Sequence, residues 1–265
     1  MRPETKSTVR SALFGLGFRV NRRTPPANVL NLIRKLRPQD CGLDLIRIGA
    51  PADGGYLVPN DLDGIEYCFS PGVSSVSDFE DHLANLHIRS FLADASVDSP
   101  QIVRPELTFD KKFLGASDRG DYITLASWKN KYLKDYGGDL MLQMDIEGSE
   151  YEVILNLPEA LLAQFRILVI EFHNLDRLFD PFVFRLIASS FERLLDLFHV
   201  VHLHPNGSDG SLKSGEIEIP RTMEFTFINK ERADSKGPRS DFPHRLDADN
   251  IPGTSLPLPK CWYSS

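Results

Sequence analysis

Apolar residues follow two alternating patterns along the chain: short continuous runs, and stretches with helical spacing. Short runs of branched and aromatic side chains bounded by turn residues are typical of buried strands, whereas apolar residues three and four positions apart indicate amphipathic helices. The runs predict strands at residues 65–69, 88–92, 107–114, 140–144, 167–172, 200–203 and 224–228. The helical spacing predicts helices at residues 29–36, 76–86, 125–136, 149–155 and 182–197.

Strands that alternate with helices predict an α/β fold. Each strand–helix–strand unit places its strands in parallel through a right-handed crossover, with helices on both faces of the sheet. The last strand, 224–228, follows a long loop (205–220) instead of a helix, so it can run antiparallel beside its predecessor. We therefore expect a doubly wound fold with a mostly parallel seven-stranded sheet and an antiparallel final strand.

The pattern divides the chain into three segments. Residues 1–45 form an N-terminal arm and a helix, and residues 46–231 carry the predicted sheet. From residue 232 to 265 the chain is rich in Pro, Asp, Ser and Gly without strong periodicity. We expect this last segment to be an extended tail that is draped over the domain or partly disordered.

Composition narrows the class of protein. The chain has 265 residues, of which 42% are hydrophobic and 25% charged, and a domain of this size folds without disulfide or metal staples. Its three cysteines, Cys41, Cys68 and Cys261, are odd in number and never spaced as CxxC. This argues against a disulfide framework or a structural zinc site, and favours a reducing, cytoplasmic location.

Charge and hydropathy bear on the partners. A net charge of −7 argues against nucleic acid as the main partner, because phosphate binding needs a basic face. No apolar run reaches the roughly 20 residues of a membrane-spanning helix. The N-terminus is basic on both sides of an apolar patch at residues 12–18, which does not fit a cleaved signal peptide. We expect a solvated arm, with weak membrane-surface contact as the alternative; the oligomeric state carries no sequence signal.

In a doubly wound sheet, ligands bind beyond the carboxyl ends of the strands. Ser70 and Gly72 follow the first predicted strand, and a glycine there lets a ligand approach the backbone closely. Alternatively, Ser70 and Gly72 only form an ordinary strand-to-helix turn. The segment lacks GxGxxG, which disfavours a dinucleotide and hence an NAD-dependent oxidoreductase. Asp94 follows the second strand, about 20 residues after Gly72, where an acid can accept both ribose hydroxyls of a nucleoside; otherwise it is a capping or turn residue.

Three acids gather after the fourth predicted strand: Asp145, Glu147 and Glu150. They either form an active-site rim or simply favour the positive end of the following helix. We favour function for Asp145, which ends the strand directly. His173 ends the fifth strand, where its side chain is suited to accepting a hydroxyl proton near neutral pH.

An HxH pair follows in His202 and His204, which alternate on one strand. Two such histidines can share a metal ion, but the sequence offers no spaced third ligand. We interpret them as surface or substrate-facing histidines.

Residues 144–154, MDIEGSEYEVI, resemble the signature of the FkbM-type methyltransferases. Similar segments are DGGY at 53–56, Ser70-Pro-Gly72 with the following Asp78-Phe-Glu80, and IEFH at 170–173, so that the resemblance extends over about residues 46–228. The chain departs from the family pattern in its reduced glycine turn, in Gln143-Met144 in place of a lysine, and in Ala126 in place of an aspartate.

The resemblance implies a Rossmann-like class I methyltransferase fold, S-adenosylmethionine (SAM) as methyl donor, and O-methylation of a sugar, glycan or natural-product hydroxyl. Together with the strand-end positions, it gives a predicted cofactor site of Ser70, Gly72, Glu80, Asp94, Ser117, Asp118 and Asp145. The predicted catalytic residues are His173 as base, with Asp145 and Glu147 orienting the acceptor. A divalent ion there is an alternative, and no resident metal is predicted.

Other functions remain open at this stage. The acceptor atom can be a nitrogen of a small molecule instead of an oxygen. The chain can also be a catalytically silent protein that uses the nucleotide pocket to bind a partner. Among acceptors, the clustered carboxylates favour a hydroxylated saccharide, and the basic arm makes a lipid-linked glycan a variant of that prediction.

Overall fold

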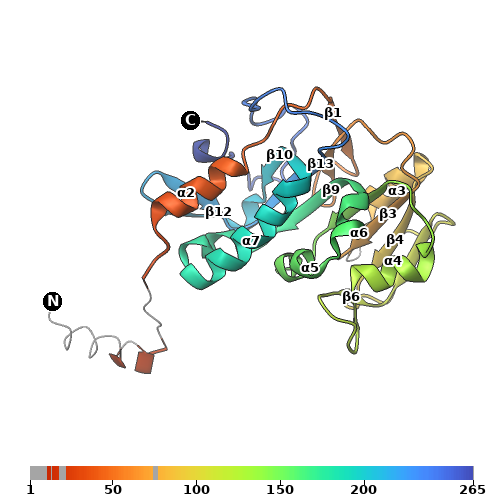
Figure 1. Cartoon of the computed structure of the whole chain (residues 1–265), viewed down its shortest axis with the longest axis horizontal. Coiled ribbons are helices and arrows are strands. Elements are labelled where there is room, and N and C mark those ends of the chain that lie inside the picture. Colours follow the sequence, from red (N-terminus) through yellow and green to blue (C-terminus); the bar gives the residue numbers. More distant parts are fainter. Residues whose placement is uncertain (1–10, 13, 18–21, 74–76, 265) are drawn as a thin grey trace.

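The computed structural model describes residues 11–12, 14–17, 22–73 and 77–264, and is built around a seven-stranded sheet (Figure 1). The strands lie in the order β10-β13-β9-β8-β3-β4-β5. Their bounds are β3 (Tyr67–Pro71), β4 (Arg89–Ala93), β5 (Leu107–Asp110), β8 (Leu140–Met144), β9 (Phe165–Phe172), β10 (Phe198–Pro205) and β13 (Met223–Asn229).

The sheet begins at its centre. From β3 the chain steps outward through β4 to β5, and then returns to β8 on the other side of β3, so the order reverses between β3 and β8. β3, β4, β5, β8 and β9 pair in parallel, whereas β13 is inserted between β9 and β10 and runs antiparallel to both. The expected Rossmann-like doubly wound fold, with a mostly parallel seven-stranded sheet and an antiparallel final strand, is thus confirmed.

Both faces of the sheet are covered. One face packs against α2 (Pro26–Lys35), α4 (Leu125–Leu133), α5 (Glu150–Asn156), α6 (Glu159–Gln164) and α7 (Pro181–Leu197). The other face packs against α3 (Asp78–Asn85) and a hairpin of β1 (Leu45–Ile48) and β2 (Tyr56–Pro59). Burial of the sheet on both faces explains why its strands are apolar runs and not alternating sequences.

Alternate strand residues separate the two cores. On β8, Leu140, Leu142 and Met144 face the five-helix side, whereas Met141 faces α3 and the hairpin. All eight residues of β9 are buried. α7, which packs on β10, begins at Pro181 directly after Asp180, whose side chain accepts hydrogen bonds from two backbone N–H groups of the first turn.

Three features differ from the sequence-based expectation. The β1–β2 hairpin and the hairpin of β11 (Ser211–Ser214) and β12 (Ile217–Pro220) were not expected, because their turns are long or lie inside a polar loop. The predicted strand 107–114 divides into β5 and a short β6 (Phe113–Leu114), which pairs with β7 (Tyr122–Ile123) instead of continuing in the sheet. Short 3-10 turns lie at η1 (Leu175–Phe179), η2 (Gly207–Asp209) and η3 (Lys260–Trp262).

The C-terminal segment packs on the domain through a few anchors. Trp262 is completely buried, and its Nε1 donates a hydrogen bond to the Glu218 carbonyl oxygen. This places η3 beside α2, at the edge of the five-helix face (Figure 1). The predicted basic arm lies mostly outside the described residues. Among the helices that the structure describes, none is long and apolar enough to cross a membrane.

Candidate functional site

A cavity of about 460 Å³ opens at the carboxyl ends of β3, β4 and β8, at the point where the strand order reverses. Its lining includes Gly72, Asp94, Asp145 and Glu147, together with Asp53 from the β1–β2 turn and Tyr122 from β7. A volume of this size is typical of sites for small molecules and cofactors. The strand-end rule therefore located the cavity from the sequence.

Gly72 allows the strands to meet at the cavity floor. Its φ is +87°, and a Cβ at this position would lie 1.4 Å from the carbonyl oxygen of Asp145. The Gly72 N–H donates to Ala93 O on the β4 side, and the Asp145 N–H donates to Pro71 O. Only glycine fits this crossing, because any side chain would push β3 and β8 apart.

Asp94 has the turn role considered from the sequence and also lines the cavity, whereas its contact with ribose hydroxyls stays a prediction. Its Oδ1 accepts hydrogen bonds from the Ser96 N–H (2.7 Å) and hydroxyl (2.6 Å), which is a local turn motif. The same side chain lies in the cavity lining beside Ala93. The turn fixes the carboxylate at the rim of the cavity.

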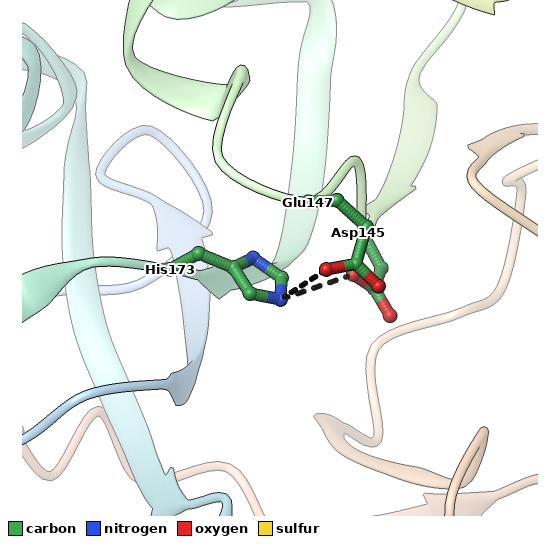
Figure 2. Close-up of side chains that lie close together, drawn as sticks. All are labelled: Asp145, Glu147 and His173. Carbon is green, nitrogen blue, oxygen red and sulfur yellow. Dashed lines mark ion pairs between the residues drawn. The ribbon is translucent and has the colours of Figure 1, made fainter. Parts of the chain in front are cut away.

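Four side chains form what we call the acid–histidine cluster: Asp145, Glu147, Glu150 and His173. Figure 2 shows Asp145 and Glu147 turned towards the imidazole of His173. His173 Nε2 lies 3.8 Å from Asp145 Oδ1 and 3.5 Å from Glu147 Oε2, and Nδ1 lies 3.1 Å from Glu150 Oε1. The ends of β8 and β9 thus bring together acids and a histidine that are separated by more than twenty residues.

Glu150 is the member of this cluster that is held most firmly in place. Its side chain is completely buried, and Oε1 accepts hydrogen bonds from the backbone N–H groups of Gly148 (3.0 Å) and Ile146 (3.3 Å). The Tyr151 hydroxyl donates to the carbonyl oxygen of His173 (2.6 Å). Together these bonds hold the imidazole ring with Nδ1 towards Glu150 and Nε2 towards the other two acids.

Two non-glycine residues of this region have left-handed backbone conformations. Glu147 has a φ of 56° and Asn174, directly after His173, has a φ of 58°. Such conformations are uncommon for a glutamate and cluster at functional sites. The conformation of Glu147 belongs to the turn that directs its 86% exposed carboxylate back towards His173.

Burial and mutual charge shift the proton affinities of the cluster. Burial raises the pKa of Asp145 to about 7, against the lowering effect of His173. Burial by itself lowers the pKa of His173, but the hydrogen bond to Glu150 and the charges of Glu150, Asp145 and Glu171 outweigh it and raise the pKa to about 9. At neutral pH, therefore, both ring nitrogens of His173 are protonated and the imidazole is positively charged in this arrangement.

A buried acid pair lies next to the cluster. Glu171 of β9 is the direct cross-strand partner of Glu224 of β13. Glu171 accepts a hydrogen bond from Asn206, and Glu224 accepts one from Asn250 of the C-terminal segment. Burial raises the pKa of both carboxyls. Sequence reasoning missed this pair because the pairing of β9 with β13 was needed to find it.

Comparisons with known proteins give distant likenesses only. No protein-family model and no curated protein matches the chain. Among solved structures, a fibrillarin/Nop5p complex chain is 12% identical, with a TM-score of 0.37 over 63% of this chain and 74% of that one. TrmN from Thermus thermophilus is 10% identical, with a TM-score of 0.29 over 62% of this chain. The match spans 44% of the TrmN chain. Similarities of this size carry no argument about function, and the fold assignment rests on the strand order.

Some predicted cofactor residues lie outside the cavity lining. Ser70 and Glu80 are buried under it, between β3 and α3, where the Ser70 hydroxyl contacts Glu80 and the amide oxygen of Gln143. Burial raises the pKa of Glu80 to about 7. Asp118 accepts hydrogen bonds from Thr124 and Ser127 at the start of α4. Direct cofactor contacts of Ser70, Glu80, Ser117 and Asp118 stay predictions.

The HxH pair binds the C-terminal segment. His202 Nε2 lies 2.8 Å from Asp247 Oδ1, and His204 Nδ1 lies 3.8 Å from the same oxygen. Both histidines are nearly buried. His202 and His204 are therefore not surface or substrate-facing residues as interpreted from the sequence; they connect β10 to the C-terminal segment through Asp247.

Asp53 and Tyr122 are cavity residues that sequence reasoning did not select. The DGGY segment at 53–56 was the available signal for Asp53, but its turn had not been placed beside the strand ends. A larger hollow, about 620 Å³, lies at the amino end of β10 near His199 and Lys230. This hollow lies at the amino ends of the strands. Doubly wound folds bind their ligands at the carboxyl ends instead.

Proposed function

We propose that the protein is a SAM-dependent methyltransferase that methylates a hydroxyl group. The observation that carries this proposal is the cavity at the strand-order reversal, which joins Gly72, Asp94 and Asp145 in one site. The class I methyltransferase fold places a nucleoside-type ligand at this edge of the sheet. The resemblance of residues 144–154 to the FkbM-type signature adds support from the sequence.

The residues present fit SAM. Gly72 lines the cavity and presents only its backbone to the methionine part, while the Asp145 carbonyl oxygen fills the place of its missing Cβ. Asp94, which follows β4, is placed to accept the two ribose hydroxyls. The sequence after β3 has no phosphate-binding GxGxxG loop, and SAM has no phosphate to bind.

When bound, SAM supplies an electrophilic methyl group on sulfur. The acceptor oxygen forms a bond to the methyl carbon while the sulfur–carbon bond breaks, and the electron pair stays on sulfur to give S-adenosylhomocysteine. The protein's part is to hold the acceptor in line with the methyl group, which contributes several kcal/mol. Asp145 and Glu147 line the cavity, and their carboxylates are the groups that would orient an acceptor.

The acceptor proton also needs a destination. With a pKa of about 9, His173 carries its own proton at neutral pH and cannot accept another. In the site without a metal ion, the exposed carboxylate of Glu147 is the open acceptor, and passes the proton to solvent. His173 as base, the assignment favoured by the sequence, requires first that its proton be displaced.

A hydroxylated saccharide is the acceptor class that we propose. Sugars present several hydroxyl donors, and the cavity mouth presents the carboxylates of Asp53, Asp145 and Glu147 as acceptors. Carboxylates accept hydrogen bonds only, so they suit a neutral polyol.

The test is a methyl-transfer assay on purified protein with SAM and a panel of free monosaccharides, glycosides and small amines. We expect S-adenosylhomocysteine to form only with a saccharide, and mass spectrometry to find a methyl ether on the product. Asp145→Asn should reduce turnover by at least tenfold without unfolding the protein. Methylation of amines alone would contradict the O-methylation proposal, and SAM binding without any turnover would favour the silent binding protein.

A further inference from the structure

Three side chains of the acid–histidine cluster present a set of metal-ligand atoms. One oxygen of Asp145, one oxygen of Glu147 and a ring nitrogen of His173 all lie within 4.8 Å of one another. Figure 2 shows the three side chains converging from the ends of β8 and β9. Ligands about 2.1 Å from an octahedral ion lie about 3 Å apart. The observed separations of 3.5 and 3.8 Å from Nε2 therefore need only a small closing movement.

Buried carboxylate oxygens without a hydrogen-bond donor are the second observation. Asp145 Oδ1, the oxygen that faces His173 Nε2, is buried and has no hydrogen-bond partner. Glu171, which is 3% exposed, also has one carboxylate oxygen without a partner. Over the described ranges, no lysine or arginine forms an ion pair with these carboxylates. A buried carboxylate oxygen without a donor is costly, and a bound cation would satisfy it.

The orientation of the imidazole also fits a ligand. Metal-bound histidines usually donate their second ring N–H to a carboxylate, which fixes the tautomer and aims the other nitrogen at the ion. Glu150 is in this position: it holds Nδ1 at 3.1 Å, and is itself fixed by two backbone N–H groups. Nε2 is thereby aimed at Asp145 and Glu147, and a cation bound there would take the place of the Nε2 proton.

We infer that Asp145, Glu147 and His173 bind a divalent cation of the Mn²⁺ type in the candidate site. Two carboxylates and one imidazole form a mixed oxygen–nitrogen set, which suits Mn²⁺ better than the thiolate-preferring ions. Three protein ligands leave coordination positions open for oxygen atoms of water or of an acceptor. The role of the ion in methyl transfer rests on the proposed function, whereas its binding does not.

The test is a titration of the full chain, stripped of metals with EDTA and dialysed, with Mn²⁺ alone. Electron paramagnetic resonance measures free Mn²⁺, and calorimetry measures the heat of binding. We expect one site in the wild type and at least tenfold weaker binding in Glu147→Gln. Because the Glu147 side chain is 86% exposed, this substitution should leave the fold intact. Glu152→Gln, an exposed glutamate on α5, is the matched control and should bind Mn²⁺ as the wild type does.

Equal Mn²⁺ affinity in the wild type and Glu147→Gln would overturn the inference, as would the absence of binding to the folded wild type. A parallel SAM titration in EDTA separates the two proposals. SAM binding without Mn²⁺ binding removes the metal site alone. Mn²⁺ binding without SAM binding supports the metal site, and removes the proposed methyltransferase function.

Discussion

At the scale of single residues, Gly72 is the position with the least freedom. Gly72→Ala would force a Cβ into the carbonyl group of Asp145 at a backbone φ of +87°. We expect the free energy of unfolding to fall by about 3 kcal/mol or more, and SAM affinity to be lost. Urea unfolding measures the first effect. Gly137→Ala, where a Cβ meets nothing within 4 Å, is the control and should be close to neutral; equal stability of the two variants would contradict the packing described here.

Glu80 predicts a pH dependence of stability. Its pKa is about 7 in the folded protein and near 4.5 when exposed, so the folded state retains a proton that the unfolded state releases. This contribution is complete below pH 4.5, declines as the pH rises, and is lost above about pH 7. The loss amounts to about 3 kcal/mol. A protonated Glu80 can donate to Ser70, whose hydroxyl then donates to Gln143.

Glu80→Gln keeps the shape of the protonated acid and removes its titration. We expect this variant to be more stable than the wild type at pH 8, and to show a flatter stability profile between pH 5 and pH 8. Urea unfolding at several pH values measures this difference. A profile that is parallel to that of the wild type would show that Glu80 is not a buried acid with a raised pKa.

The sequence predicted individual site residues where one strand end was enough to place them. Gly72, Asp94 and Asp145 each follow a single apolar run, and the structure brings all three to one cavity. Glu150 and Glu171 were harder, because their roles depend on a neighbour from another strand: His173 for Glu150, and β13 for Glu171. Pairing of this kind leaves no local pattern in the sequence.

At the scale of elements, the C-terminal segment is tied to the sheet by one carboxylate. Asp247 contacts His202 and His204 of β10, and its pKa lies well below the usual range because these hydrogen bonds outweigh the effect of its burial. Asp247→Ala should lower the free energy of unfolding by about 2 kcal/mol at neutral pH. Asp249→Ala, two residues further along the tail, is the matched control.

The same tie has a pH dependence with a known sign. A carboxyl with a depressed pKa contributes stability above its unfolded pKa near 4, and loses that contribution as the pH falls towards the folded value. The difference in stability between wild type and Asp247→Ala should therefore shrink below pH 4. Urea midpoints at pH 5.5 and pH 3 measure it. An unchanged difference at the two pH values would contradict the ion-pair account.

Elements were predictable where burial imposed one pattern. β8 lies at residues 140–144 as expected. It is flanked by a strand on each side and covered on both faces, so all of its residues are buried. The prediction of a single strand at 107–114 was wrong, because the edge strand β5 ends at Asp110. The Asp110 carboxylate accepts a hydrogen bond from the indole of Trp128. The β1–β2 hairpin has a glycine-rich turn instead of a two-residue turn, so it lacked the usual hairpin signal.

At the scale of the whole molecule, the parallel order and the antiparallel last strand followed from the alternation of runs and helices. The alternation did not show which additional segments would close the site. The β1–β2 turn contributes Asp53 to the cavity, and the Asp53 N–H donates to the carbonyl oxygen of Asn250 in the tail. Contacts between segments about two hundred residues apart depend on the completed fold.

The central claim is that the cavity at the strand-order reversal binds SAM. Calorimetric titration with S-adenosylhomocysteine and SAM tests it most directly, on the wild type, on Asp94→Asn, and on Asp98→Asn as an exposed control nearby. Asparagine retains an oxygen for the turn at Ser96 but loses the charge. We predict micromolar binding by the wild type and Asp98→Asn, and at least tenfold weaker binding by Asp94→Asn. Folded wild-type protein that binds neither ligand, or equal affinities in all three proteins, would contradict the claim.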